Sequence, residues 1–160
     1  MYLDISQHNI IMGLDSVLKW NNGSEYTGNL PPHIVELLQN DNDINWIPSF
    51  SISSSGYRAD FRGKAYAQVI KHLTGYSLYN DLHTTELKIM HDKLKLLEHY
   101  WNDDHEYKTV NEAFELGEDN LRSWIDMLTD IYVPSPIELK GLTALFKICY
   151  ENDLQLYASY

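Results

Sequence analysis

Apolar residues recur at helical spacing in three stretches of the chain. The longest stretch, Thr85 to Trp101, places large apolar residues every three or four positions and charged residues on another face. Shorter stretches run from Ile10 to Leu18 and from Tyr66 to Leu73, the latter followed by Gly75, a residue suited to closing a helix. The spacing predicts a helix in each stretch, and in the longest one Leu94 should face the core.

Four more segments carry either a signal for a helix end or a further apolar stripe. Pro31-Pro32 stands before an apolar stretch, and proline suits the first turn of a helix. Thr109-Val110-Asn111-Glu112 and Ser135-Pro136-Ile137-Glu138 match capping boxes, in which the hydroxyl and the carboxylate each accept a free backbone amide. The second box leads into an apolar stripe from Leu139 to Cys149, and another stripe runs from Leu121 to Ile131. We expect helices in all four segments.

Three further segments alternate in part between apolar and polar residues, as strands do: Met1 to Ser6, Trp46 to Ser53 and Leu154 to Tyr160. We expect a small sheet of two or three strands, with the two terminal segments paired to each other. The predicted fold class is therefore mainly α, with about seven helices and a small β-sheet from terminal and middle segments. An α+β fold is the alternative.

The length of the chain fits a single globular domain spanning residues 1–160. A domain of this size buries about 68–70% of the surface that its unfolded chain exposes, so it needs no disulfide. The one cysteine, Cys149, excludes an intramolecular disulfide, and its place in an apolar stripe predicts a buried, unreactive thiol. No apolar run approaches the roughly 20 residues that span a bilayer, so we expect a cytoplasmic protein.

Acidic residues outnumber basic ones almost two to one. The chain has 23 Asp and Glu against 12 Lys and Arg, a formal net charge of −11. This charge opposes direct binding to nucleic acid or to an anionic membrane, since both are negatively charged. It favours a basic protein as the partner, such as a nucleic-acid-processing enzyme or a toxin.

The acidic charge is concentrated in one segment. Between Glu98 and Asp119 there are eight acidic residues and one base, Lys108, with aromatic residues among them. Aromatic rings supply buried contact area, while carboxylates steer a basic partner into contact. The candidate partner-binding residues are Glu98, Trp101, Asp103, Asp104, Glu106, Tyr107, Glu112 and Glu115. The alternative is a solvated face that only keeps the protein soluble.

A smaller cationic cluster, Arg58, Arg62 and Lys64, precedes the helix predicted from Tyr66. Guanidinium groups and the free amides at a helix start both attract anions. The cluster therefore predicts, as the alternative to a protein-binding surface, a site for a small anion or phosphate. The same cations have a simpler use, which is pairing with the carboxylates of this acidic chain.

No motif in the sequence specifies a reaction. The closely spaced histidines are His83, His91, His99 and His105. Because their separations are 8, 8 and 6 residues, no two of them have the four-residue spacing of zinc ligands on a helix. No serine lies in a Gly-x-Ser-x-Gly turn. We expect no metal, no cofactor and no catalytic residue.

The leading hypothesis is a non-enzymatic acidic protein that occludes a basic surface on a partner protein, as an immunity protein or a phage-type inhibitor does. The alternative is an enzyme or sensor that binds a small anion through Arg58, Arg62 and Lys64. The sequence does not determine the oligomeric state.

Overall fold

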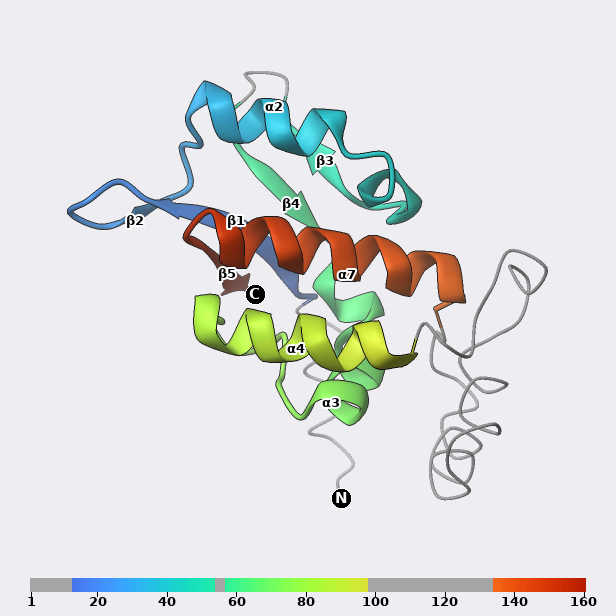
Figure 1. Ribbon diagram of the computed structural model, residues 1–160. Helices are drawn as coiled ribbons and strands as arrows, with labels where there is room; N and C mark the ends of the chain where they lie inside the picture. The colour runs from blue at the N-terminus through green and yellow to red at the C-terminus, as the bar shows by residue number, and fades with distance from the viewer. Residues whose placement is uncertain (1–12, 54–56, 98–133) are drawn as a thin grey trace, which may run out of the picture.

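The computed structural model describes residues 13–53, 57–97 and 134–160, which form a five-stranded antiparallel sheet and four α-helices (Figure 1). The strands are β1 (Asp15–Asn21), β2 (Tyr26–Thr27), β3 (Ser51–Ile52), β4 (Ala59–Phe61) and β5 (Leu154–Ser159). The helices are α2 (Pro32–Asn40), α3 (Ala67–Thr74), α4 (Thr84–Leu97) and α7 (Pro136–Glu151), with two short 3₁₀ turns, η1 (Ile44–Trp46) and η2 (Gly63–Ala65). The prediction of a mainly α fold with about seven helices and a two- or three-stranded sheet is therefore wrong.

The central strand is β1, which the sequence pattern assigned to a helix over Ile10 to Leu18. It pairs antiparallel with β5 along most of its length, and on its other edge with β4 and then β2. Val17 and Leu18 point to opposite faces of the sheet, and both are buried. Leu14, just before the strand, is buried as well, so apolar residues recur at helix-like spacing along a segment that is shielded on both faces.

The C-terminal strand was predicted correctly, and the structure shows two partners for it that were not predicted. β5 pairs with β1, and Leu82 bridges Leu156 on the other edge of β5. The predicted partner, residues 1–6, lies outside the described residues. In the middle segment, β3 falls within the predicted stretch of 46–53, although Trp46 itself ends η1.

The helices whose ends carry local signals were predicted correctly. α2 begins with Pro32 in its first turn, and α3 ends at Gly75, whose φ of 84° is the left-handed conformation that glycine adopts readily. α7 begins with the predicted capping box at Ser135. The helices predicted from Thr109 and from Leu121, and the end of the helix predicted to Trp101, lie outside the described residues.

The core is built around α7, which crosses the sheet with α2 on one side of it and α4 and α3 on the other (Figure 1). Five of its apolar residues are fully buried: Leu139, Leu142, Leu145, Phe146 and Cys149. Cys149 is buried as predicted, and burial raises the pKa of its thiol. Among the described helices, none is long and apolar enough to span a lipid bilayer.

Candidate functional site

All eight predicted partner-binding residues lie between residues 98 and 133, outside the described part of the chain. The sequence of this segment carries ten acidic and two basic side chains, a net charge of −8. The described ranges carry twelve acidic and ten basic side chains, a net charge of −2. The body that the structure describes is therefore nearly neutral, and the charge of the protein belongs mostly to the segment between α4 and α7.

The helices α4 and α7 bring the two ends of this segment to the same end of the molecule. They pack against each other in opposite directions, so α4 ends on the side where α7 begins (Figure 1). Tyr150, one residue before the end of α7, contacts Lys88 and His91, which lie well before the end of α4. The described residues that flank the segment, at the end of α4 and the start of α7, thus lie on the same side of the molecule.

Hydrogen bonds around one buried carboxylate fix the start of α7. Glu138 Oε1 accepts from the backbone amide of Ser135 at 3.1 Å, and Ser135 Oγ accepts from the Glu138 amide at 3.3 Å. The Tyr66 hydroxyl donates to Glu138 Oε2 at 2.8 Å. These hydrogen bonds hold the first turn of α7 in a fixed position against Tyr66.

A polar cluster joins α4 to α7 at the surface. Lys88 Nζ donates to Asp92 Oδ2 at 2.9 Å, and His91 Nδ1 lies 3.0 Å from Asp92 Oδ1. The hydrogen bonds from His91 and from Lys88 lower the pKa of Asp92. The His91 ring meets Tyr150 edge-on, with 5.3 Å between the ring centres. The ring contact joins the two helices, whereas both pairs with Asp92 lie within α4, and we assign the cluster a structural role.

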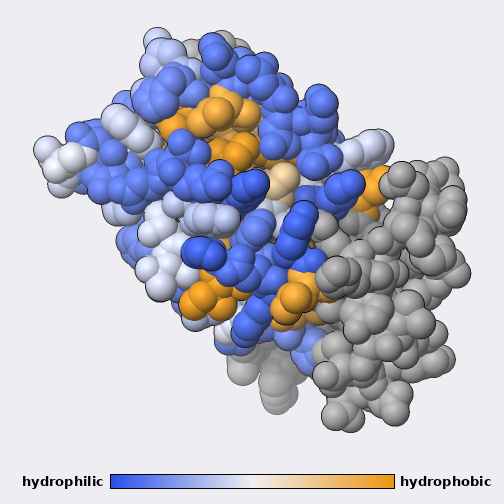
Figure 2. Space-filling view, in the orientation of Figure 1, coloured by the Kyte–Doolittle hydropathy of each residue, from blue (hydrophilic) through white to orange (hydrophobic). Residues whose placement is uncertain are grey.

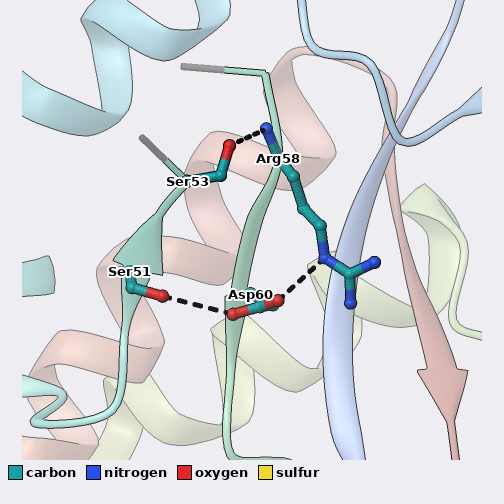
Figure 3. A network of polar contacts seen from close by, with 4 residues as sticks. All are labelled: Ser51, Ser53, Arg58 and Asp60. Carbon is teal, nitrogen blue, oxygen red and sulfur yellow. Dashed lines mark hydrogen bonds and ion pairs between the residues drawn. The ribbon is translucent and has the colours of Figure 1, made fainter. Parts of the chain in front are cut away.

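Arg58, the first residue of the predicted anion site, is engaged by a carboxylate (Figure 3). Its Nε donates to Asp60 Oδ2 at 2.9 Å, and Ser51 Oγ donates to Asp60 Oδ1 at 3.3 Å. The backbone amide of Arg58 donates to Ser53 Oγ at 3.2 Å. This network ties β3 to β4, so the side chain of Arg58 stabilises the sheet edge in the manner of an internal ion pair.

The other two cations lie farther along the chain. Arg62 is four residues from Arg58, about 13 Å in extended backbone, and Asp60 lies between them on the same face. The guanidinium of Arg62 lies against Gly13, where an added Cβ would be 3.2 Å from Nη2. Lys64 lies in η2, and its amide donates to the Leu14 carbonyl at 3.1 Å. Anion binding by these residues stays a prediction, and the carboxylate between the arginines weighs against it.

A second acidic region was missed by sequence reasoning. Residues 20–57 contain Glu25, Glu36, Asp41 and Asp43 but no Lys or Arg. This stretch forms β2, α2, η1 and β3, and it presents Trp46 with 51% of its surface exposed. Counting basic residues segment by segment would have revealed the region, but Trp46 was assigned to a predicted strand instead.

Asp153, in the turn between α7 and β5, holds the β1–β2 hairpin. Its carboxylate accepts hydrogen bonds from the Tyr26 hydroxyl at 2.8 Å and from Asn21 Nδ2 at 2.9 Å. The bond to Asp153, together with partial burial, raises the pKa of Tyr26. Asp153 has a φ of 55°, a left-handed conformation that Asp tolerates better than most residues. The cluster positions the hairpin against the turn between α7 and β5.

In the described ranges, His, Cys, Asp and Glu side chains form no group of three that could hold a metal ion, and His99 and His105 lie outside those ranges. The chain matches no protein family, no curated protein and no solved structure. Function is therefore inferred from charge and geometry alone.

Proposed function

We propose that this protein is a non-enzymatic binding protein that covers a basic surface of a partner protein with its acidic segment, residues 98–119. The observation that supports the proposal best is the place of this segment in the chain. It carries most of the net charge, and the stretch that contains it, residues 98–133, connects α4 to α7, whose packing places the end of α4 and the start of α7 on the same side of a nearly neutral body.

A concentrated charge is suited to recognition of a basic protein. Opposite charges raise the rate of encounter and disfavour wrong partners, while aromatic residues such as Trp101 and Tyr107 supply apolar contact area. Enzymes and toxins that act on nucleic acids carry basic surfaces of this kind, because they neutralise phosphates. An immunity protein or a phage-type inhibitor works by covering such a surface. The buried single cysteine suits a cytoplasmic location, which belongs to the same proposal.

The test is affinity capture from the native host with three forms of the full chain. One is wild type, the second carries Asp103→Lys and Asp104→Lys, and the third carries Asp15→Lys and Glu151→Lys. The third variant is the matched control, because it makes the same change of charge at exposed positions of the described body.

We expect wild type and the control to capture the same basic protein, and the Asp103/Asp104 variant to lose it. Circular dichroism should show all three forms equally folded. Equal capture by all three forms, or capture of no basic protein by wild type, would refute the proposal.

A further inference from the structure

The turn of the β1–β2 hairpin carries an Asn-Gly pair, Asn22-Gly23, and no other asparagine of the chain precedes a glycine. All four residues of the turn, 22–25, are exposed. The hairpin projects from the body, and its visible surface is hydrophilic to neutral (Figure 1, Figure 2). Water therefore has access to the peptide bond between the two residues.

Two backbone amides polarise the side-chain carbonyl of Asn22. Its Oδ1 accepts hydrogen bonds from the amides of Ser24 and Glu25, at 2.9 and 3.0 Å. The amide of Asn22 itself donates to the carbonyl of Glu25 at 3.0 Å, which closes the turn. Two backbone donors on one carbonyl oxygen stabilise the negative charge that the oxygen gains when a nucleophile adds to the carbon. The turn thus makes Cγ of Asn22 a better electrophile.

The nucleophile is the backbone nitrogen of Gly23, the next residue in the chain. Its N–H donates to Oδ1 of Asn21 at 2.9 Å. A carboxylate holds the same side chain, because Nδ2 of Asn21 donates to Oδ2 of Asp153 at 2.9 Å. Hydrogen bonds in a chain polarise one another, so the carboxylate makes Oδ1 of Asn21 a stronger acceptor for the Gly23 proton. Gly23 also lacks a Cβ that would crowd its nitrogen, and glycine adopts its φ of 98° without strain.

We propose that Asn22-Gly23 is a site of self-modification, where the hairpin promotes the loss of ammonia from Asn22. The nitrogen of Gly23 forms a bond to Cγ of Asn22, and its proton passes through solvent to Nδ2. The Cγ–Nδ2 bond breaks, and Nδ2 leaves as ammonia. The product is a five-membered succinimide ring. Water then opens the ring at one of its two carbonyl carbons, which gives aspartate or isoaspartate at position 22.

The two products affect the hairpin differently. Aspartate keeps a side-chain oxygen that can accept from the two amides, so the turn is retained. Isoaspartate makes Cβ and Cγ part of the main chain, which lengthens the turn by one atom. Because the length of a turn sets the register of its hairpin, isoaspartate should disturb the pairing of Tyr26 and Thr27 with β1. We expect amide exchange in the hairpin to be about 10-fold faster in the isoaspartyl form, and unchanged in Asn22→Asp.

Incubation of the purified full chain at body temperature and neutral pH tests the site. Mass spectrometry of peptides detects the conversion, because a carboxyl group in place of the amide adds one mass unit. Isoaspartyl methyltransferase detects isoaspartate, which marks the cyclic route, since direct hydrolysis of the side chain gives aspartate alone. A parallel sample in guanidinium chloride measures the unfolded chain, in which the amides of Ser24 and Glu25 no longer hold Oδ1 of Asn22.

Four substitutions on the hairpin and just after it form two matched pairs. Gly23→Ala places a Cβ beside the attacking nitrogen, and Gly28→Ala adds the same group where no atom lies within 4 Å. Asn21→Ala removes the acceptor of the Gly23 proton, and Asn29→Ala removes an exposed side chain just after β2. Melting temperatures identify any variant that is not folded.

We expect Asn22 to convert about 10-fold faster in the folded chain than in guanidinium chloride, with both aspartate and isoaspartate as products. Gly23→Ala should slow the conversion about 10-fold and Asn21→Ala about 3-fold, because both contacts are exposed to solvent. Gly28→Ala and Asn29→Ala should convert as wild type does.

Conversion that is no faster in the folded chain than in guanidinium chloride would overturn the proposal, because the hairpin would then not promote the reaction. Aspartate without isoaspartate, or a wild-type rate for Gly23→Ala, would overturn the cyclic route. A wild-type rate for folded Asn21→Ala would overturn the positioning role of Asn21.

Discussion

Cys149 shows how burial removes the reactivity of a side chain. It lies in α7 beside Phe146 and Leu145, with none of its surface exposed. Burial disfavours the charged thiolate and raises the pKa of the thiol, so Cys149 stays protonated at neutral and mildly alkaline pH. The apolar stripe from Leu139 was enough to predict this, because the spacing of apolar residues along one helix is a local property.

The thiol of Cys149 should therefore not react with a thiol reagent while the protein is folded. In 5,5′-dithiobis(2-nitrobenzoate) at pH 8, we expect no absorbance change over minutes, and release of one equivalent of thiolate once urea unfolds the chain. The reason for the difference is the raised pKa together with the lack of access to the sulfur. Rapid release of one equivalent from the folded protein would show that Cys149 is exposed.

Trp46 shows the opposite case, because its exposure depends on distant residues. Gly141 contacts the turn of Asp43 and Ile47 from almost one hundred positions away in the chain. Nothing in the neighbouring sequence indicates this contact, and alternation alone assigned Trp46 to a strand. The exposed face of a residue follows from tertiary packing, which a local pattern does not contain.

At the scale of elements, local signals predicted the described helices and the strands β3 and β5, but not the strands β1, β2 and β4. Three helices carry a signal within a few residues of one of their ends. These signals are the prolines at the start of α2, the glycine after α3 and the capping box at the start of α7. β1 was assigned to a helix because its identity comes from pairing with β5, about 140 residues away. β4 was not predicted at all, since it has only three residues and its partners are β1 and β3.

Two leucines on α4 test the assignment of its buried face. Leu94 has 0% of its surface exposed and Leu96 has 66% exposed. We expect Leu94→Ala to lower the free energy of unfolding by about 2–5 kcal/mol, because it loses burial and leaves a cavity. Leu96→Ala is the matched control and should change it by less than about 0.5 kcal/mol. Urea denaturation measures both, and similar losses for the two variants would contradict the assignment.

Gly141 allows a second test at this scale, because two effects of alanine oppose each other. Helix propensity favours alanine by about 1 kcal/mol, but its Cβ would meet the Asp43 carbonyl oxygen at 2.8 Å. Backbone does not yield as a flexible side chain does, so we expect a net loss of about 1–3 kcal/mol in the free energy of unfolding.

Gly28→Ala is the control for this substitution. Gly28 has no atom within 4 Å of an added Cβ and no positive φ, so the change should be neutral or slightly stabilising. A stabilised Gly141→Ala variant in urea denaturation would show that η1 does not need the close approach to α7.

At the scale of the whole molecule, charge divides the chain into a nearly neutral body and an acidic segment. The sequence alone predicted the segment, because counting charges needs no structure. It also identified the cations Arg58, Arg62 and Lys64, but not the geometry that separates the two arginines by the carboxylate of Asp60. The common attachment of residues 98–133 through α4 and α7 depends on how those helices pack, which the sequence pattern did not indicate.

The most direct test of the central claim is the rate at which the purified chain associates with its captured basic partner, measured by stopped flow over a range of ionic strengths. Attraction between exposed charges is screened beyond about 8–10 Å at physiological ionic strength. Wild type should therefore associate fast at low salt and slow steeply as salt is added, and Asp103→Lys with Asp104→Lys should associate at least about 10-fold more slowly with a flatter salt dependence. Equal rates and equal salt dependence for the two forms would contradict the claim that the acidic segment recognises the partner.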